Sequence, residues 1–143
     1  MTQMNVSHIS TLLLLFLVLL TGCYSENVKV HGTVSFPDGQ PLTKGVVVFQ
    51  SEKHVAKGTL DDSGKFVLGS IRIADGIPLG IYKVFITLAS VPDKNFIPPP
   101  SEPDAMNYIS LVADQYTSAE KTPLTCEITK SGTQHLVVEP PLK

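Results

Sequence analysis

The sequence contains no tryptophan, a single arginine (Arg72) and only two cysteines among its 143 residues. Its 11 Lys and Arg against 13 Asp and Glu give a formal net charge of −2. Nucleic-acid-binding proteins carry a basic excess, so we expect no nucleic-acid partner. The missing tryptophan also weakens the case for a sugar-binding site, where exposed aromatic rings usually stack on the ligand. The length allows one ordinary domain.

Motifs for catalysis and metal binding are absent as well. There is no His-x-x-Glu or His-Glu-x-x-His pattern. The acidic turn Asp61-Asp62-Ser63-Gly64 lacks the further oxygen ligands and the final Glu of a calcium loop. His31 and His135 could meet across paired strands and hold a metal, but two solvent-facing polar positions are the favoured interpretation. We therefore predict no enzyme, no cofactor and no metal site.

Charged side chains are also missing from residues 1–22, which carry the apolar run Thr11–Leu20. The run is shorter than the about 20 residues that span a bilayer, and it suits the apolar region of a secretory signal. Directly after it, Leu20-Thr21-Gly22-Cys23 resembles the lipobox of bacterial lipoproteins. The resemblance implies cleavage between Gly22 and Cys23 and a lipid on the Cys23 sulfur. A plain signal peptide and a wrongly chosen start codon are the alternatives.

The lipobox implies membrane attachment through the N-terminal lipid and an extracytoplasmic location in the cell envelope. Tyr24 and Ser25 follow the cysteine, in place of the Asp that retains lipoproteins in the inner membrane of well-studied Gram-negative cells. This favours the outer membrane. Lipoprotein modification adds more than one acyl chain, so the anchor needs no basic patch.

The second cysteine, Cys126, is left without a partner in the chain if Cys23 carries lipid. It alternates with Leu124 and Ile128 on one face of a predicted strand. We therefore expect a buried and inert thiol.

After residue 22 the chain is rich in β-branched residues, which favour strands: Val, Ile and Thr supply 30 positions. The longest strand is expected to direct Tyr82, Val84, Ile86 and Leu88 to one face. The turn Asp61–Gly64 is expected to close a hairpin, because Gly accepts the positive φ of a tight turn. Seven strands are predicted, at 28–36, 46–49, 55–60, 65–68, 81–89, 124–129 and 135–138.

Residues 90–121 interrupt this pattern with five prolines and few apolar residues. Such a long irregular segment is unusual in a compact domain and is often functional. We predict a surface excursion, within which 104–112 forms either a helical turn or a short edge strand. Its candidate interaction surface consists of Pro98, Pro99, Pro100, Tyr108 and Tyr116. A stiff extended spacer is the alternative interpretation of the prolines.

Several short motifs occur in a specific order along residues 28–138. They are Val30-x-Gly32-x-Val34, Asp38-Gly39-Gln40-Pro41-Leu42, Gly45–Phe49, Thr59-x-Asp61-x-x-Gly64-x-Phe66, Asp75-Gly76-x-Pro78-x-Gly80-x-Tyr82 and Thr122-Pro123-Leu124-Thr125. Together they resemble small envelope lipoproteins of planctomycete-type bacteria that carry a transthyretin-like, carboxypeptidase regulatory-like domain. The family usually shows Pro-x-Lys-Tyr where this chain has Ala113-Asp114-Gln115-Tyr116, which suggests an insertion within 90–116.

The resemblance implies an all-β, seven-stranded prealbumin-like sandwich at 28–139, preceded by a signal peptide (1–22) and a lipid-anchored linker (23–27). It implies no established activity. Gly80-x-Tyr82 also resembles the tyrosine corner of β-sandwiches, in which the phenol bonds to nearby backbone. A hydroxyisourate hydrolase, which shares the fold, would need a Tyr-Arg-Gly-Ser terminus, whereas this chain ends Pro-Pro-Leu-Lys. We expect a structural or protein-interaction module, and a carbohydrate- or other ligand-binding module is the alternative.

Overall fold

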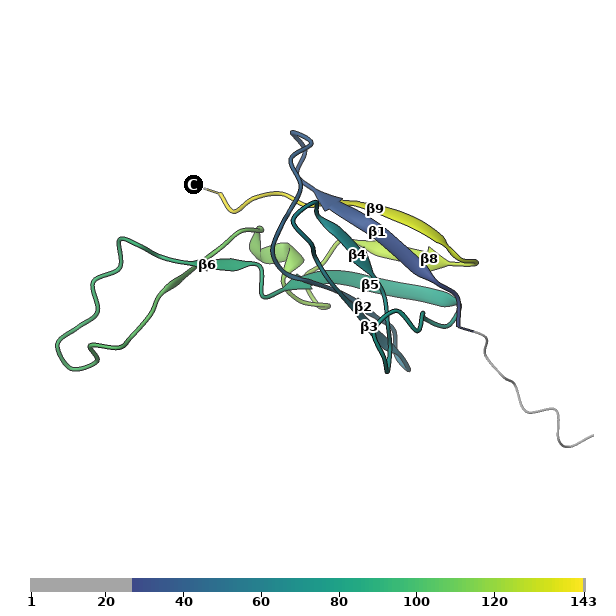
Figure 1. The fold of residues 1–143 in the computed structure, drawn as a ribbon, viewed down its shortest axis with the longest axis horizontal. Helices are drawn as coiled ribbons and strands as arrows, with labels where there is room; N and C mark the ends of the chain where they lie inside the picture. The colour runs from purple at the N-terminus through teal and green to yellow at the C-terminus, as the bar shows by residue number, and fades with distance from the viewer. Residues whose placement is uncertain (1–26, 143) are drawn as a thin grey trace, which may run out of the picture.

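The computed structural model describes residues 27–142, which form a β-sandwich with a long arm projecting from one end (Figure 1). Within these residues, nine strands and one short 3-10 helix make up the fold. In chain order they are β1 (Val30–Ser35), β2 (Val46–Gln50), β3 (Val55–Thr59), β4 (Lys65–Val67), β5 (Gly80–Thr87), β6 (Ser90–Pro92), β7 (Tyr108–Ser110), η2 (Asp114–Tyr116), β8 (Thr125–Ile128) and β9 (Gly132–Val137).

Seven of these strands build the sandwich, which confirms the all-β fold predicted from the sequence. One sheet has the order β4-β1-β9 and the other β3-β2-β5-β8. β1 and β9 run parallel, with Val30 opposite Gly132 and Ser35 opposite Val137. The other pairs within the two sheets are antiparallel. The first and last strands of the sandwich therefore lie side by side.

The core fills the space between the two sheets with the apolar residues of each alternating strand. Val30 and Val34 of β1 are buried. At the centre, the ring of Phe49 lies 6.1 Å from that of Phe66 and 6.2 Å from that of Tyr82, between centroids. Such tilted aromatic contacts contribute about 0.5–1.5 kcal/mol each beyond the area that they bury. Three strands from both sheets thus meet in one aromatic cluster.

Gly32 faces this core from the middle of β1, where a side chain would not fit. A Cβ atom there would overlap the carbonyl oxygen of Gln134 on β9 and lie 2.7 Å from the Phe66 ring. The missing side chain lets the sheet and the aromatic cluster approach each other closely.

The turn Asp61–Gly64 forms and closes the expected hairpin: the Asp61 N–H bonds to the Lys65 carbonyl at 2.9 Å, and Lys57 and Gly69 form an antiparallel bridge with hydrogen bonds of 2.9 and 3.0 Å. The carboxylate of Asp61 accepts the backbone N–H groups of Ser63 and Lys65, both at 2.8 Å, and Gly64 has a φ of +72°. However, β3 pairs with β2 and β4 pairs with β1, so the turn carries the chain from one sheet to the other. Local turn chemistry specifies the tight reversal, and it does not specify the further strand with which β3 or β4 forms its continuous ladder.

The end of β5 differs from the expected alternation. Leu88 has a φ of +56° and is 75% exposed, while Ala89 is buried. The left-handed residue shifts the alternation by one position, so Leu88 does not share the inward face of Tyr82, Val84 and Ile86. The chain leaves the sandwich at this point and enters the arm.

Candidate functional site

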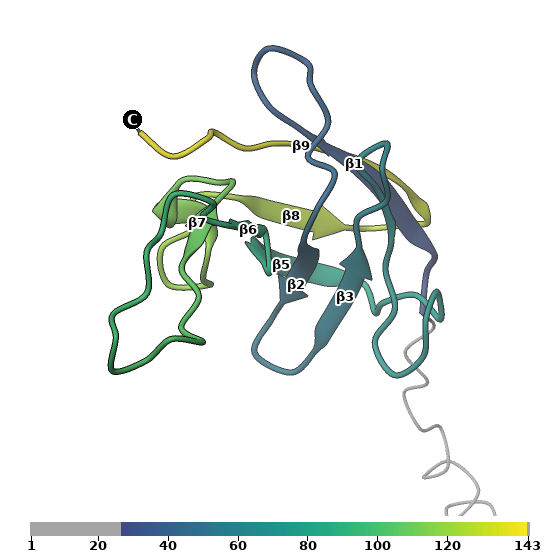
Figure 2. The same ribbon diagram turned by 60° about the vertical axis from the view of Figure 1, so that its left-hand side comes forward.

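The arm is built from residues 90–110 and is the most prominent feature outside the sandwich (Figures 1 and 2). β6 and β7 pair antiparallel at its base, with Ser90 opposite Ser110 and Pro92 opposite Tyr108. One further ladder bond follows, from the Asp93 N–H to the Asn107 carbonyl at 2.9 Å. Of the two possibilities left open for 104–112, the structure therefore contains the strand. The arm is a two-stranded ribbon that ends in a proline-containing loop.

The arm presents apolar side chains to solvent. Ile97 is 87% exposed and Tyr108 is 55% exposed, with its phenol directed to the Met106 sulfur at 3.8 Å. Among the predicted surface residues, Pro99 and Pro100 are exposed and Pro98 is half-buried. The other large exposed apolar side chains of the arm are Phe96, Met106 and Ile109. Exposed apolar side chains gathered on one projection are typical of a binding surface.

The sequence predicts Tyr116 on the same surface, and this expectation is wrong. Its side chain is only 6% exposed and belongs to the core cluster. The N–H of Tyr116 bonds to the Ala113 carbonyl, and the Ala113 N–H bonds to the Glu139 carbonyl at 2.8 Å. These bonds fix the short helix η2 against the C-terminal segment and turn the ring inward. Tyr108 is therefore the one tyrosine of the predicted pair that faces solvent.

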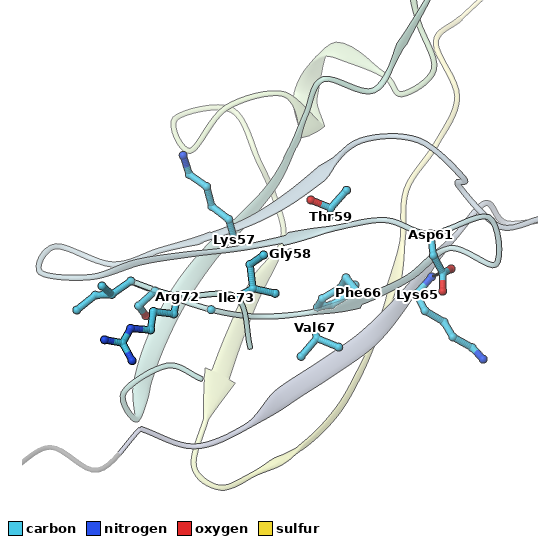
Figure 3. Close-up of a pocket in the computed structure, with 12 residues that line it drawn as sticks. Lys57, Gly58, Thr59, Asp61, Lys65, Phe66, Val67, Arg72 and Ile73 are labelled. Atoms are coloured by element: carbon cyan, nitrogen blue, oxygen red, sulfur yellow. Dashed lines mark hydrogen bonds between the residues drawn. The ribbon is translucent and has the colours of Figure 1, made fainter. Parts of the chain in front are cut away.

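An open groove of about 650 Å³ lies along β3, β4 and the loop 69–73 (Figure 3). Its charged lining consists of Lys57, Lys65, Arg72 and Asp61. Figure 3 shows the three cationic side chains pointing in different directions rather than toward one another. Asp61 is already bonded to the backbone of its own turn, which holds its pKa below the ordinary value. The groove therefore lacks the convergent polar groups that define a small-molecule site.

The histidines His31 and His135 both face solvent on the outer side of the β4-β1-β9 sheet. Each one pairs with a threonine of the neighbouring strand: His31 Nε2 lies 2.8 Å from Thr133 Oγ1, and His135 Nδ1 lies 2.9 Å from Thr33 Oγ1. Within residues 27–142 no three His, Cys, Asp or Glu side chains come together in a way that could hold a metal ion. One ring nitrogen of each histidine is used in a cross-strand hydrogen bond.

Cys126 is a free thiol on β8 that is half-buried, not fully buried as the sequence predicts. Burial raises the pKa of the thiol, which keeps it protonated at neutral pH. Its face is the predicted one, since Leu124 and Cys126 pack against the core and Ile128 lies within it. The incomplete burial follows from the position of β8 at the edge of its sheet.

The tyrosine-corner hydrogen bond is present at the start of β5. The Tyr82 hydroxyl donates to the Pro78 carbonyl at 2.7 Å, and Gly80 between them has a φ of +154°. Burial raises the pKa of the Tyr82 phenol, so the donor stays protonated. This contact fixes the loop before β5 onto the core.

Sequence reasoning missed the loop 69–76, which carries two of the most exposed apolar residues of the structure. Ile71 and Ile73 are 92% and 97% exposed. Their alternation in Ile71-Arg72-Ile73 resembles that of a strand, but Ala74 has a φ of +61° and the segment forms a loop. The Asp75-Gly76 turn signal that follows it is the feature of the sequence that could have indicated this.

The lipobox residues Gly22 and Cys23 lie outside the residues that the structure describes, as does the whole of the predicted signal segment. Over residues 27–142, no helix is long and apolar enough to cross a membrane.

Comparison with known proteins gives no family assignment. No family model matches the chain, and no curated protein matches it. Among solved structures, the fold is similar to that of the Bacillus anthracis TIE protein, with a TM-score of 0.41 and 13% sequence identity. The match covers 80% of this chain and 17% of that one, so this chain spans less than a fifth of the protein that it matches.

Proposed function

We propose that this chain is a non-catalytic, lipid-anchored cell-envelope protein whose β6–β7 arm binds another envelope protein. The exposed apolar surface of the arm is the observation that carries the proposal. Its two strands are bonded only to each other over Ser90–Pro92 and Tyr108–Ser110, so each also has a free edge that could accept a further strand.

The composition of the arm supports a protein partner. Ile97, Met106 and Tyr108 supply apolar and aromatic contact area, of the kind that forms the centre of protein interfaces. The arm also carries three carboxylates and one lysine, Asp93, Glu102, Asp104 and Lys94, which are suited to a polar rim. The loop is stiffened by prolines, which reduces the entropy lost on binding.

The placement of the two ends supports an anchored display role. In both ribbon views the arm and the start of β1 lie at opposite ends of the molecule (Figures 1 and 2). A lipid on Cys23 would hold the start of β1 near the membrane and direct the arm away from it. Tyr24 and Ser25 after the cysteine favour the outer membrane as the site of anchoring.

The carbohydrate-binding alternative loses support from the burial of Tyr116. Of the two tyrosines that could have stacked on a sugar, one is part of the core. The other, Tyr108, lies on the arm with its phenol directed to the Met106 sulfur.

The proposal is tested in cells that produce the full chain. Labelled palmitate should be incorporated by the wild type and not by Cys23→Ser, and equal labelling of both would refute the anchor.

For the arm, a photo-cross-linking amino acid replaces Ile97 and, as a control, the exposed Lys53 in the β2–β3 loop. Light should produce a discrete cross-linked protein from position 97 only. Reproducible binding on a glycan array without any cross-link would favour the carbohydrate alternative.

A further inference from the structure

The end of the sandwich at which β1 begins presents two isoleucines that no neighbour among residues 27–142 covers. Ile71 and Ile73 are almost fully exposed, with Arg72 between them. The exposure of two large apolar side chains to water is unfavourable because of the hydrophobic effect. Adjacent side chains of this kind are usually covered by another surface.

The backbone of this loop is held in place by specific hydrogen bonds. The carboxylate of Asp75 accepts the N–H groups of Ser70, Ile71 and Arg72 at 2.6, 3.1 and 3.0 Å. The Ser70 hydroxyl donates to the Gly76 carbonyl at 3.1 Å. The fold therefore fixes the isoleucines in their exposed position.

The loop lies directly beside the chain that leads to Cys23. Val28 and Ile77 exchange two backbone hydrogen bonds, of 2.9 and 3.0 Å. Cys23 precedes Val28 by five residues, which span at most about 18 Å when fully extended. An anchor at Cys23 would therefore keep this loop within about 18 Å of the bilayer surface.

The charges at this end agree with an anionic lipid surface. Lys29, Arg72 and Lys130 lie on the three segments that meet here, and the Lys29 N–H bonds to Ser131 next to Lys130 at 3.2 Å. Among the described residues, the carboxylates on these segments are Asp75, which is bonded to the loop backbone, and Glu127 on β8, and the sequence has a further one, Glu26, in the linker to Cys23. Anionic head groups attract such cations over short distances.

We propose that Ile71 and Ile73 insert into the lipid surface to which Cys23 is anchored, with Arg72 contacting the lipid phosphates. This inference rests on the proposed lipid anchor. It assigns to the loop 69–76 a second membrane contact, which orients the sandwich on the bilayer instead of leaving it free to rotate on a short linker.

A single introduced tryptophan tests the insertion, because the chain has none of its own. Full-length protein carrying Ile71→Trp is purified from bacteria that lipidate it and placed in vesicles of phosphatidylethanolamine and phosphatidylglycerol. The vesicles are made with and without lipids brominated in the acyl chains, which quench nearby tryptophan. Interfacial segments sit about 5–10 Å into the head-group boundary, so we expect emission to fall by about twofold. Ile97→Trp on the arm is the matched control and should keep its emission.

The outcomes separate the inference from the anchor on which it rests. Palmitate labelling is measured on the same preparation. If the Ile71→Trp protein is labelled and its indole emission is not quenched, the inference is overturned and the anchor is left intact. Unlabelled protein refutes the anchor and the inference with it. Blue-shifted emission from the Ile71→Trp protein that bromolipid does not quench shows that another part of the chain covers the loop, and this also overturns the inference. Ile73→Trp is a second reporter, and circular dichroism establishes that each variant is folded.

Discussion

At the scale of single residues, the tightest constraint is at Gly32 in the middle of β1. Gly32→Ala would place a methyl group against the Gln134 carbonyl and the Phe66 ring. Overpacking of this kind costs about 1–3 kcal/mol, and we expect that loss in the free energy of unfolding measured with urea. Gly132→Ala on the neighbouring strand is the matched control, since a Cβ there meets no atom within 4 Å. Equal stability of the two variants would contradict the prediction.

Asp75 provides a residue-level prediction about acid. Hydrogen bonds from the backbone N–H of Arg72, and then of Ser70, hold the pKa of this carboxyl below its ordinary value of 3.8. Folding therefore favours the ionised form. The stabilisation is complete above pH 3.8 and is lost as the pH falls through the lower folded-state pKa.

Urea unfolding between about pH 2 and pH 7 measures this effect. Asp75→Asn puts an amide donor where one carboxylate oxygen accepts two N–H groups, and it should be less stable than the wild type at neutral pH. It should also lose less stability on acidification. Asp62→Asn is the control, because Asp61 and not Asp62 accepts the hydrogen bonds of the turn Asp61–Gly64. The free energy of unfolding of this control should follow that of the wild type at every pH. A variant of Asp75 with the full acid dependence would show that this carboxyl does not contribute.

At the scale of elements, the arm is attached to the sandwich without being part of its core. No residue from 90 to 110 belongs to the core cluster. Ser90 and Ser110 lie directly opposite each other, so an Asn-Gly turn could join them in place of residues 91–109. We expect this shortened chain to differ from the full chain by less than about 1 kcal/mol in its free energy of unfolding, because loop length costs little.

The same shortened chain should keep palmitate labelling and cooperative thermal unfolding. It should not compete with the full chain for the partner that cross-links at position 97. Loss of cooperative unfolding would contradict the prediction. It would show that the arm stabilises the sandwich even though no residue of the arm belongs to the core cluster.

The strands of the sandwich could be predicted from the sequence because each depends on a short local pattern. Alternation in β1 and the apolar run in β2 are visible without knowing any neighbour. The turn at Asp61 correctly predicts a hairpin, but the sheet to which each of its strands belongs depends on distant edges, so the sequence does not show that β3 and β4 lie in different sheets. The predictions for Leu88 and Tyr116 fail for a similar reason, since one left-handed residue and one helical turn reverse the direction of a side chain.

The candidate sites were predictable only in part. Prolines and low hydrophobicity indicated the arm, and Tyr108 was identified on it. The loop 69–76 was not, because Ile71 and Ile73 look like ordinary core residues in sequence. Only the positions of Asp75 and Ile77 in three dimensions show that this loop is fixed, exposed and next to the N-terminal chain.

At the scale of the whole molecule, the fold places two unlike surfaces at opposite ends. The start of β1, with the loop 69–76, carries isoleucines and cations, whereas the arm carries apolar residues and a net negative charge. This separation allows one end to contact lipid while the other contacts a partner. It also makes the two proposals independent in experiment, since the loop that holds Ile71 and the arm that holds Ile97 are far apart in both ribbon views.

The central position of β1 in its sheet has a mechanical consequence. If the proposed anchor at residue 23 and the proposed partner at the arm are pulled apart, the force enters the fold at the start of β1. That force acts on β1, which is bonded to β4 on one side and to β9 on the other. The pull is directed along the strand, so it loads both ladders in shear and many hydrogen bonds must break together. Forced unfolding is limited by its rate, and this arrangement slows it at the point where the load enters the fold.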